Sequence, residues 1–340
     1  MLSFQKLPAE ILLIIAQCLG GVYLLAQVDR ILLCKAWYSV TQSVAWEVIN
    51  LSINNFERFS RAPTDIQHFI RSRVKDLSIS GSYDTNVTFQ TQNSETGTQE
   101  TWRVAKLRSL LQAHNTTLCT SLKDFSTITL PQMQRLHTFA LKISSESTIY
   151  TETDSTWTDT LRNLVTSLPN TLTSLTIDKL GVTSRFSTGA RDPHTVCKVV
   201  LAKTTLPSLK HLRLRLHCIC PSLFATKTIQ SHATLETLVV ALDAYSPQLG
   251  MVHHAHRCTQ PQQSSQRLYD DMVDAAEGAV KAGCFPALKK ARILRYDVQE
   301  LLFHSLDVLS GVMGRLPEGV GFDDVDWEDK LEWLVIWEDL

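Results

Sequence analysis

The sequence predicts an α/β fold in which short strands alternate with helices along most of the chain. The main observation is a recurring apolar phrase: one apolar residue, any two residues, a second apolar residue, any one residue, and a third apolar residue. Each copy ends in alternation, which is typical of a strand with one buried face. The six copies are Val74/Leu77/Ile79, Leu136/Phe139/Leu141, Leu172/Leu175/Ile177, Leu209/Leu212/Leu214, Leu235/Leu238/Val240 and Leu288/Ala291/Ile293.

Helical patterns lie between the predicted strands. Residues 102–114 and 157–168 each place their apolar side chains on one helix face, and 194–202 and 266–282 are two further candidates. Strands and helices that alternate at a period of tens of residues indicate a leucine-rich-repeat solenoid.

The spacing of the copies is irregular. Their first apolar residues are 62, 36, 37, 26 and 53 residues apart, whereas a regular repeat has about 20–29 residues. The sequence therefore predicts an irregular, leucine-rich-repeat-like α/β solenoid. The alternative is a general α/β domain whose strands share a common phrase.

The N-terminal segment, residues 7–51, combines helical periodicity with a high apolar content. Proline in its opening Leu-Pro-x-Glu-Ile suits the first turn of a helix. A Cys-x-x-Trp sequence follows the first helix, and a second tryptophan closes the segment. The positions that define this order are Leu7, Pro8, Ile11, Leu12, Ile15, Leu19, Cys34, Trp37 and Trp46.

This order of residues resembles the F-box, a three-helix segment that docks on the Skp-family adaptor of SCF ubiquitin ligases. The resemblance implies that the nine positions form the adaptor-binding surface or its supporting core. It departs from the family pattern at residues 20–23, where Gly-Gly-Val-Tyr replaces the usual Asp-Pro-x-Asp. The alternative is an ordinary amphipathic helical hairpin that packs on the rest of the chain.

The resemblance implies two parts, an F-box in residues 1–50 and a solenoid in residues 51–340 that is similar to the C-terminal halves of many fungal F-box proteins. The chain would then be the substrate-recognition subunit of an SCF-type ubiquitin ligase, and not an enzyme. Its partners would be the Skp-family adaptor, through it a cullin, and a client protein of unknown identity. The alternatives are a leucine-rich-repeat scaffold outside the ubiquitin ligase and a metal-dependent hydrolase that uses the loop 253–258.

Composition and cysteine usage limit the possible partners and the cellular compartment. The chain is 44% hydrophobic with a net charge of −1, which supplies no argument for nucleic acid or an anionic membrane as partner. The apolar run 11–26 is shorter than the about 20 apolar residues of a membrane span, and it lacks the flanks of a signal peptide. Eight cysteines without a Cys-x-x-Cys pair predict reduced, mostly buried thiols. We therefore expect an intracellular protein, cytoplasmic or nuclear.

Only one group of residues resembles a metal site, namely His253, His254, His256 and Cys258. A closed zinc site needs four ligands, and no second half is visible in the sequence. We therefore predict a solvated polar loop, with no metal and no cofactor. The sequence also lacks a phosphate-binding glycine loop, a nucleophile elbow and a His-Glu-x-x-His motif. A further histidine and cysteine group is expected on or beside a strand: His211, His217, Cys218 and Cys220.

Three polar segments, 83–101, 144–160 and 243–266, are predicted to be loops. The C-terminal segment 323–340 is predicted to be an acidic helix, with eight acidic residues against one lysine. It either caps the last repeat through its three tryptophans or competes with an acidic client.

A client-binding surface is expected on the strand face opposite the apolar phrases. The fourth and sixth phrases place cations there, about 10 Å apart with one strand between them. Such a basic stripe suits carboxylate or phosphate groups. The predicted client-binding residues are His211, Arg213, Arg215, Lys290 and Arg292.

Overall fold

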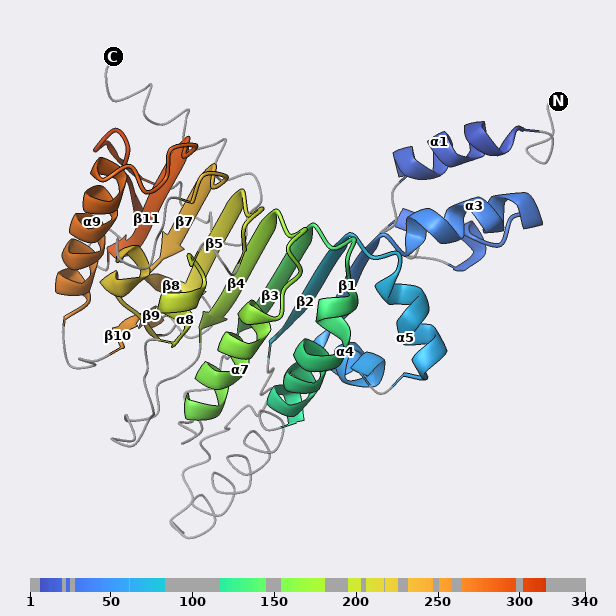
Figure 1. The fold of residues 1–340 in the computed structure, drawn as a ribbon, viewed down its shortest axis with the longest axis horizontal. Helices are drawn as coiled ribbons and strands as arrows, with labels where there is room; N and C mark the ends of the chain where they lie inside the picture. Colours follow the sequence, from blue (N-terminus) through green and yellow to red (C-terminus); the bar gives the residue numbers. More distant parts are fainter. Residues whose placement is uncertain are drawn as a thin grey trace, which may run out of the picture.

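The computed structural model shows a mixed α/β protein built on one large, mostly parallel sheet (Figure 1). In the described part of the chain this sheet has nine strands in the order β1-β2-β3-β4-β5-β7-β11-β12-β13. The residues that the structure describes are 7–19, 23–24, 28–60, 62–82, 117–144, 154–180, 195–202, 206–216, 218–225, 232–246, 251–258, 264–297 and 302–315.

The first seven strands of the sheet are parallel and lie side by side in the order of the sequence. The last two run antiparallel to their neighbours and form the C-terminal edge. The parallel strands are β1 (Val48–Ser52), β2 (Asp76–Ser82), β3 (Thr138–Ser144), β4 (Ser174–Leu180), β5 (His211–Leu216), β7 (Thr237–Ala241) and β11 (Lys290–Asp297). The antiparallel strands are β12 (Leu302–Asp307) and β13 (Met313–Arg315).

Each of the six apolar phrases leads into a strand, as predicted: the first apolar residue lies just before the strand, and the second and third lie within it. Their second apolar residues pair across the sheet, and so do their third apolar residues. Leu175, Leu212 and Leu238 are 0%, 0% and 3% exposed, so this row points into the core. Strand β1 adds a seventh copy, because Ile49 pairs with Leu77 and Leu51 pairs with Ile79.

Each parallel strand after β1 begins at the same kind of hydrogen-bonded junction. The carbonyl oxygen of Glu47 accepts bonds from the backbone N–H groups of Lys75 and Asp76, at 2.8 and 2.9 Å. A carbonyl oxygen has two lone pairs and can accept both. The same pair of hydrogen bonds to one carbonyl oxygen recurs at every later parallel strand. The acceptors are the carbonyl groups of Lys75, His137, Thr173, Lys210 and Glu236. These junctions fix the register at the point where each strand enters the sheet.

Helices cover the phrase face of the sheet, since their apolar residues and the phrase residues form one continuous core. Figure 1 shows α7, α8 and α9 in sequence along this side of the strands. The helices are α4 (Ile53–Ser60), α5 (Thr64–Arg71), a helix at 117–124, α7 (Asp154–Thr166), α8 (Thr195–Val199) and α9 (Ser265–Lys281). Shorter helical turns are η3 (Phe125–Thr129), η4 (Leu130–Gln132) and η5 (Pro221–Phe224).

Three of the four predicted helices are confirmed as α7, α8 and α9, and the fourth, 102–114, lies outside the described residues. Local capping explains the limits of α9. The Ser264 side chain accepts a bond from the N–H of Arg267 at its start. Gly283 follows its last turn with φ of +70°, a left-handed conformation that glycine adopts without a Cβ penalty.

The described residues of the N-terminal segment include two longer helices and a short turn that extend beyond the β1 edge of the sheet (Figure 1). They are α1 (Ala9–Leu19), η2 (Val28–Arg30) and α3 (Lys35–Ala45). Their buried residues form a small core that is separate from the main one. This core consists of Leu12, Ala16, Leu24, Trp37, Val44 and Ala45.

The prediction of a loop over 243–266 is wrong for the described residues of this segment. They form the antiparallel pair β8 (Asp243–Ser246) and β9 (Met251–His254), then β10 (His256–Arg257), which pairs with β6 (Cys218–Ile219). The physical reason is an anchor at Asp243, which is 1% exposed and accepts a bond from the N–H of Tyr296.

Of the other two predicted loops, only 144–160 is described in part. The segment 83–101 lies outside the described residues, as does the C-terminal segment 323–340. The segment 144–160 ends in the first turns of α7, so its last seven residues are helical rather than loop. Within the described chain, no helix has both the length and the hydropathy needed to cross a membrane.

Replacement of Leu212 by Asp should abolish cooperative unfolding or leave the protein insoluble. The side chain is fully buried. Burial of an unpaired carboxylate there destabilises the fold far more than a Leu→Ala cavity, which costs about 2–5 kcal/mol. Thermal unfolding followed by circular dichroism measures the effect. Leu309→Asp is the matched control, since Leu309 is 37% exposed, and it should melt like the wild type. An unchanged melting temperature for Leu212→Asp would contradict its place in the core.

Candidate functional site

Most of the exposed large apolar side chains in the described chain belong to the N-terminal segment. Seven of eleven such residues lie there, and their exposed fractions run from 40% at Leu19 to 61% at Leu33. Isolated proteins rarely leave so many apolar side chains in water unless another molecule covers them. The seven residues are Ile11, Ile14, Leu19, Tyr23, Leu32, Leu33 and Tyr38.

The nine positions predicted to bind an adaptor divide into surface, core and junction residues. Pro8, Ile11 and Leu19 are exposed, whereas Leu12 and Trp37 are 0% and 1% exposed. The remaining positions are half-buried: Leu7, Ile15 and Cys34 against the small core, and Trp46 against the main one. Sequence reasoning did not single out five exposed residues of the same segment: Ile14, Tyr23, Leu32, Leu33 and Tyr38.

The Cys-x-x-Trp spacing is explained by the start of α3. Cys34 is the N-cap residue, and its sulfur accepts a bond from the backbone N–H of Trp37 at 3.4 Å. The indole N–H of Trp37 donates to the carbonyl oxygen of Arg30 at 2.6 Å. The Arg30 guanidinium lies 3.9 Å from the ring centre of Tyr23 and donates to its carbonyl oxygen. These contacts tie the connection between the helices to α3.

A second candidate surface is the polar face of strands β5, β7 and β11. The register places His211 and Lys290 on either side of Thr237, and Arg213 and Arg292 on either side of Val239. The predicted separation by one strand is therefore confirmed. His211 is exposed, and Arg213 and Lys290 are half-buried.

Two of the five predicted client-binding cations are mainly structural. Arg215 is 8% exposed and forms a two-pronged ion pair with Asp178 on β4. Arg292 is also 8% exposed, and its guanidinium lies 4.0 Å from the carboxylate of Asp307. The sequence could not show these acidic neighbours because they come from other strands.

Charges also alternate at the strand entrances. Glu236 lies between Lys210 and Lys289, with its carboxylate oxygens 3.3 and 2.6 Å from their ammonium groups. Hydrogen bonds from Lys289 and then Lys210 lower the pKa of the Glu236 carboxyl. Glu47 and Lys75 form a similar pair at the first junction, at 2.8 Å. These pairs are partly exposed to solvent and add little stability individually.

The histidine and cysteine loop does not form one site in the described chain. His254 Nδ1 lies 2.7 Å from the Asp243 carboxylate, whereas Cys258 is buried beside Cys197. The side chains of His253 and His256 lie outside the described part, as does His217. Within the other predicted group His211 is exposed, Cys218 is half-buried and Cys220 is buried.

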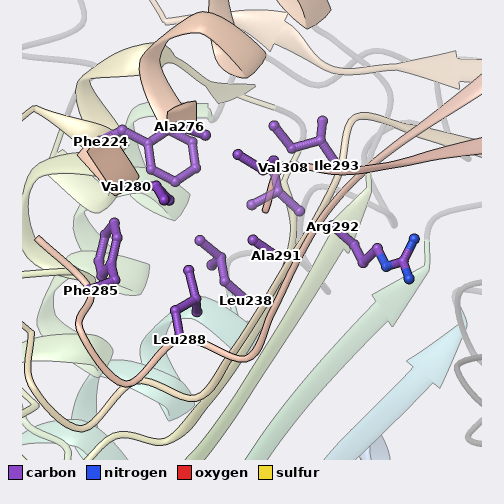
Figure 2. Close-up of a pocket in the computed structure, with 11 residues that line it drawn as sticks. Phe224, Leu238, Ala276, Val280, Phe285, Leu288, Ala291, Arg292, Ile293 and Val308 are labelled. Atoms are coloured by element: carbon purple, nitrogen blue, oxygen red, sulfur yellow. The ribbon is translucent and has the colours of Figure 1, made fainter. Parts of the chain in front are cut away.

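Two cavities of the described structure have mainly apolar linings. Figure 2 shows a cavity between α9 and strands β7 and β11, which is lined by apolar side chains while Arg292 points away from it. Its volume of about 10 Å³ is the space of about one water molecule at most. A larger cavity of about 300 Å³ lies beside β1 and α4, and its polar lining residues are Asn55 and Arg58. Neither holds a group of catalytic residues.

Comparison with models of known protein families gives no match for this chain, and comparison with curated proteins finds no similar sequence. The functional interpretation therefore depends on the exposed apolar side chains of the N-terminal segment and on the polar face of the sheet.

The contact of His254 with Asp243 predicts a shifted pKa for the His254 imidazole, which can be measured. A hydrogen bond to the carboxylate raises the pKa of the imidazole above its usual value near 6.5. The pair therefore stabilises the fold fully below about pH 6.5 and loses this contribution as the pH rises through the raised pKa. NMR titration of His254 should show a raised pKa that falls in Asp243→Asn. An equal pKa in the two proteins would contradict this pairing.

Proposed function

We propose that the chain is the substrate-recognition subunit of an SCF-type ubiquitin ligase, working in the cytoplasm or nucleus. In this proposal residues 1–50 are an F-box that binds a Skp-family adaptor and through it a cullin. Residues 51–340 are a leucine-rich-repeat-like solenoid that binds a client protein. The chain supplies proximity between client and ubiquitin-conjugating enzyme, and proximity is a large part of a bimolecular rate.

The observation that carries the proposal is the exposed apolar surface of α1, α3 and their connection. In the described part of the segment six apolar side chains are buried in its own core, and seven large apolar residues are exposed. Exposed apolar side chains in this number favour a partner-binding surface, and the order of residues in the segment resembles a family that has a partner there. The segment also lies beyond the β1 edge of the sheet, where the described chain leaves it accessible (Figure 1).

The sheet supports the second half of the proposal. Parallel strands in sequence order, with helices on one face, are the arrangement of repeat solenoids, which bind partners over extended surfaces. The strand face opposite the phrase residues carries His211, Arg213 and Lys290 in adjacent register rows, where His211 is exposed and the other two are half-buried. An acidic or phosphorylated client would match these cations.

Two aspartates in the apolar surface test adaptor binding. Ile11→Asp with Ile14→Asp places charges at residues that are 43% and 54% exposed, so the fold should persist. Desolvation of an unpaired charge in an interface costs several kcal/mol, and we expect at least about 100-fold weaker binding of a purified Skp-family adaptor. Calorimetry or a quantitative pull-down with the full chain measures the loss.

The matched control is Ile128→Asp with Leu309→Asp, which alters residues that are 55% and 37% exposed outside the segment. The control should bind the adaptor like the wild type. Absence of adaptor binding by the wild-type chain, or equal binding by both double variants, would sink the proposal.

Two other functions make different predictions. A scaffold that acts outside the ubiquitin ligase would co-purify with the adaptor but without the cullin. A metal-dependent hydrolase would need the loop 253–258 to converge on one site, yet His254 and Cys258 have separate partners. That separation favours a binding function over hydrolysis.

A further inference from the structure

Three cysteines from different parts of the chain meet in the interior. Cys197 belongs to α8, Cys220 is the N-cap residue of η5, and Cys258 directly follows β10. Their sulfur atoms all lie within 4.8 Å of one another, and the residues are 2%, 1% and 3% exposed. The Sγ atoms of Cys197 and Cys258 are 3.8 Å apart.

The fold brings these residues together through the short parallel pair of β6 and β10. His256 pairs with Cys218, and Arg257 pairs with Ile219. The next position of the same register sets Cys220 beside Cys258. Helix α8 contacts η5 and adds Cys197 as the third member.

The geometry matches a metal–thiolate site better than a disulfide. Zinc binds thiolate sulfur at about 2.3 Å in tetrahedral geometry, which places neighbouring sulfur atoms about 3.8 Å apart. A disulfide would need about 2.05 Å. The Cys197–Cys258 separation has the first value.

A catalytic role for these cysteines is unfavourable. The pKa of the Cys197 thiol is raised, first by hydrogen bonding with Cys220, and that of Cys258 is raised, first by hydrogen bonding with Cys197. Burial raises both further. The raised pKa values of Cys197 and Cys258 favour the neutral thiol, whereas a nucleophilic cysteine needs an accessible thiolate.

We propose that Cys197, Cys220 and Cys258 bind one thiophilic metal ion, with Zn²⁺ as the expected ion. Binding breaks three S–H bonds, forms three S–metal bonds and releases three protons. The Ser222 hydroxyl lies 2.8 Å from Cys220 Sγ and can donate to it once that sulfur is a thiolate, as outer-shell donors commonly do at metal sites. In the described chain the group has three members, so a tetrahedral ion would take its fourth ligand from water or another donor.

This proposal departs from the sequence prediction of no metal. The second half of the site was invisible because Cys197 lies 61 residues before Cys258. The site is independent of adaptor binding. Its expected role is structural, since the ion would join α8, η5 and β10 and contribute its binding free energy to folding.

Metal analysis of the purified full chain tests the site. Wild-type protein, prepared with a thiol reductant and without chelator, should carry one zinc ion per chain by elemental mass spectrometry. Cys197→Ser and Cys258→Ser should lose it. Cys119→Ser and Cys284→Ser are matched controls, because both residues are buried outside the group, and they should keep it.

A second measurement covers the case in which the serine variants do not fold. Cobalt(II) added to the metal-depleted wild-type chain should produce thiolate-to-cobalt charge-transfer absorption, and zinc should displace it. Copper(I) found in place of zinc would retain the site but change its ion. A wild-type chain without bound metal or cobalt absorption, or one with a disulfide between two of these cysteines, would overturn the proposal.

Discussion

The register between parallel strands is the constraint on which the rest of the structure depends. At each entrance one carbonyl oxygen accepts two N–H groups of the next strand, so that neighbouring strands begin at the same level. A slip by one residue would turn every phrase residue from the core to the polar face. Because register is set at this point, the segments between strands can vary. Loop closure depends only weakly on length, which permits copies as near as 26 and as far as 62 residues apart.

Elements that follow from a local pattern could be predicted, and elements fixed by distant contacts could not. The six phrases and the 17-residue helix α9 have clear periodicity. Helices α4 and α5 have only eight residues each, too few to give a periodic window of about 11–18 residues. Strands β8, β9 and β10 have two to four residues. Their anchor is the buried Asp243 of β8, which accepts a bond from the distant Tyr296 N–H.

The residues of the candidate surfaces also divide into those that a local pattern predicts and those that depend on distant contacts. The order of residues in the N-terminal segment identified Leu12 and Trp37, which the structure places in the small core, and Ile11, which is exposed. Exposure of Leu32 and Leu33 depends on how the connection before α3 packs, and the sequence carries no periodic signal there. The acidic partner of Arg215 likewise comes from a neighbouring strand, through the pairing of β4 with β5.

The two parts of the chain are joined by a connection that restricts their relative orientation. Only Trp46 and Glu47 separate α3 from β1. Trp46 is the C-cap residue of α3, and its ring packs edge-on against Phe69 of α5 at 6.1 Å between centroids. The Glu47 carbonyl oxygen is the first in the sheet to accept two backbone N–H groups of the next strand.

So short a connection has few free torsion angles and therefore restricts the direction of the N-terminal surface relative to the polar strand face. Under the proposed function this rigidity has a consequence for the reaction. A bound client would be presented to the ubiquitin-conjugating enzyme in a narrow range of positions, which raises the effective concentration of its lysines only where the geometry fits. The choice of lysine would then depend on the junction at Trp46 as well as on the client-binding residues.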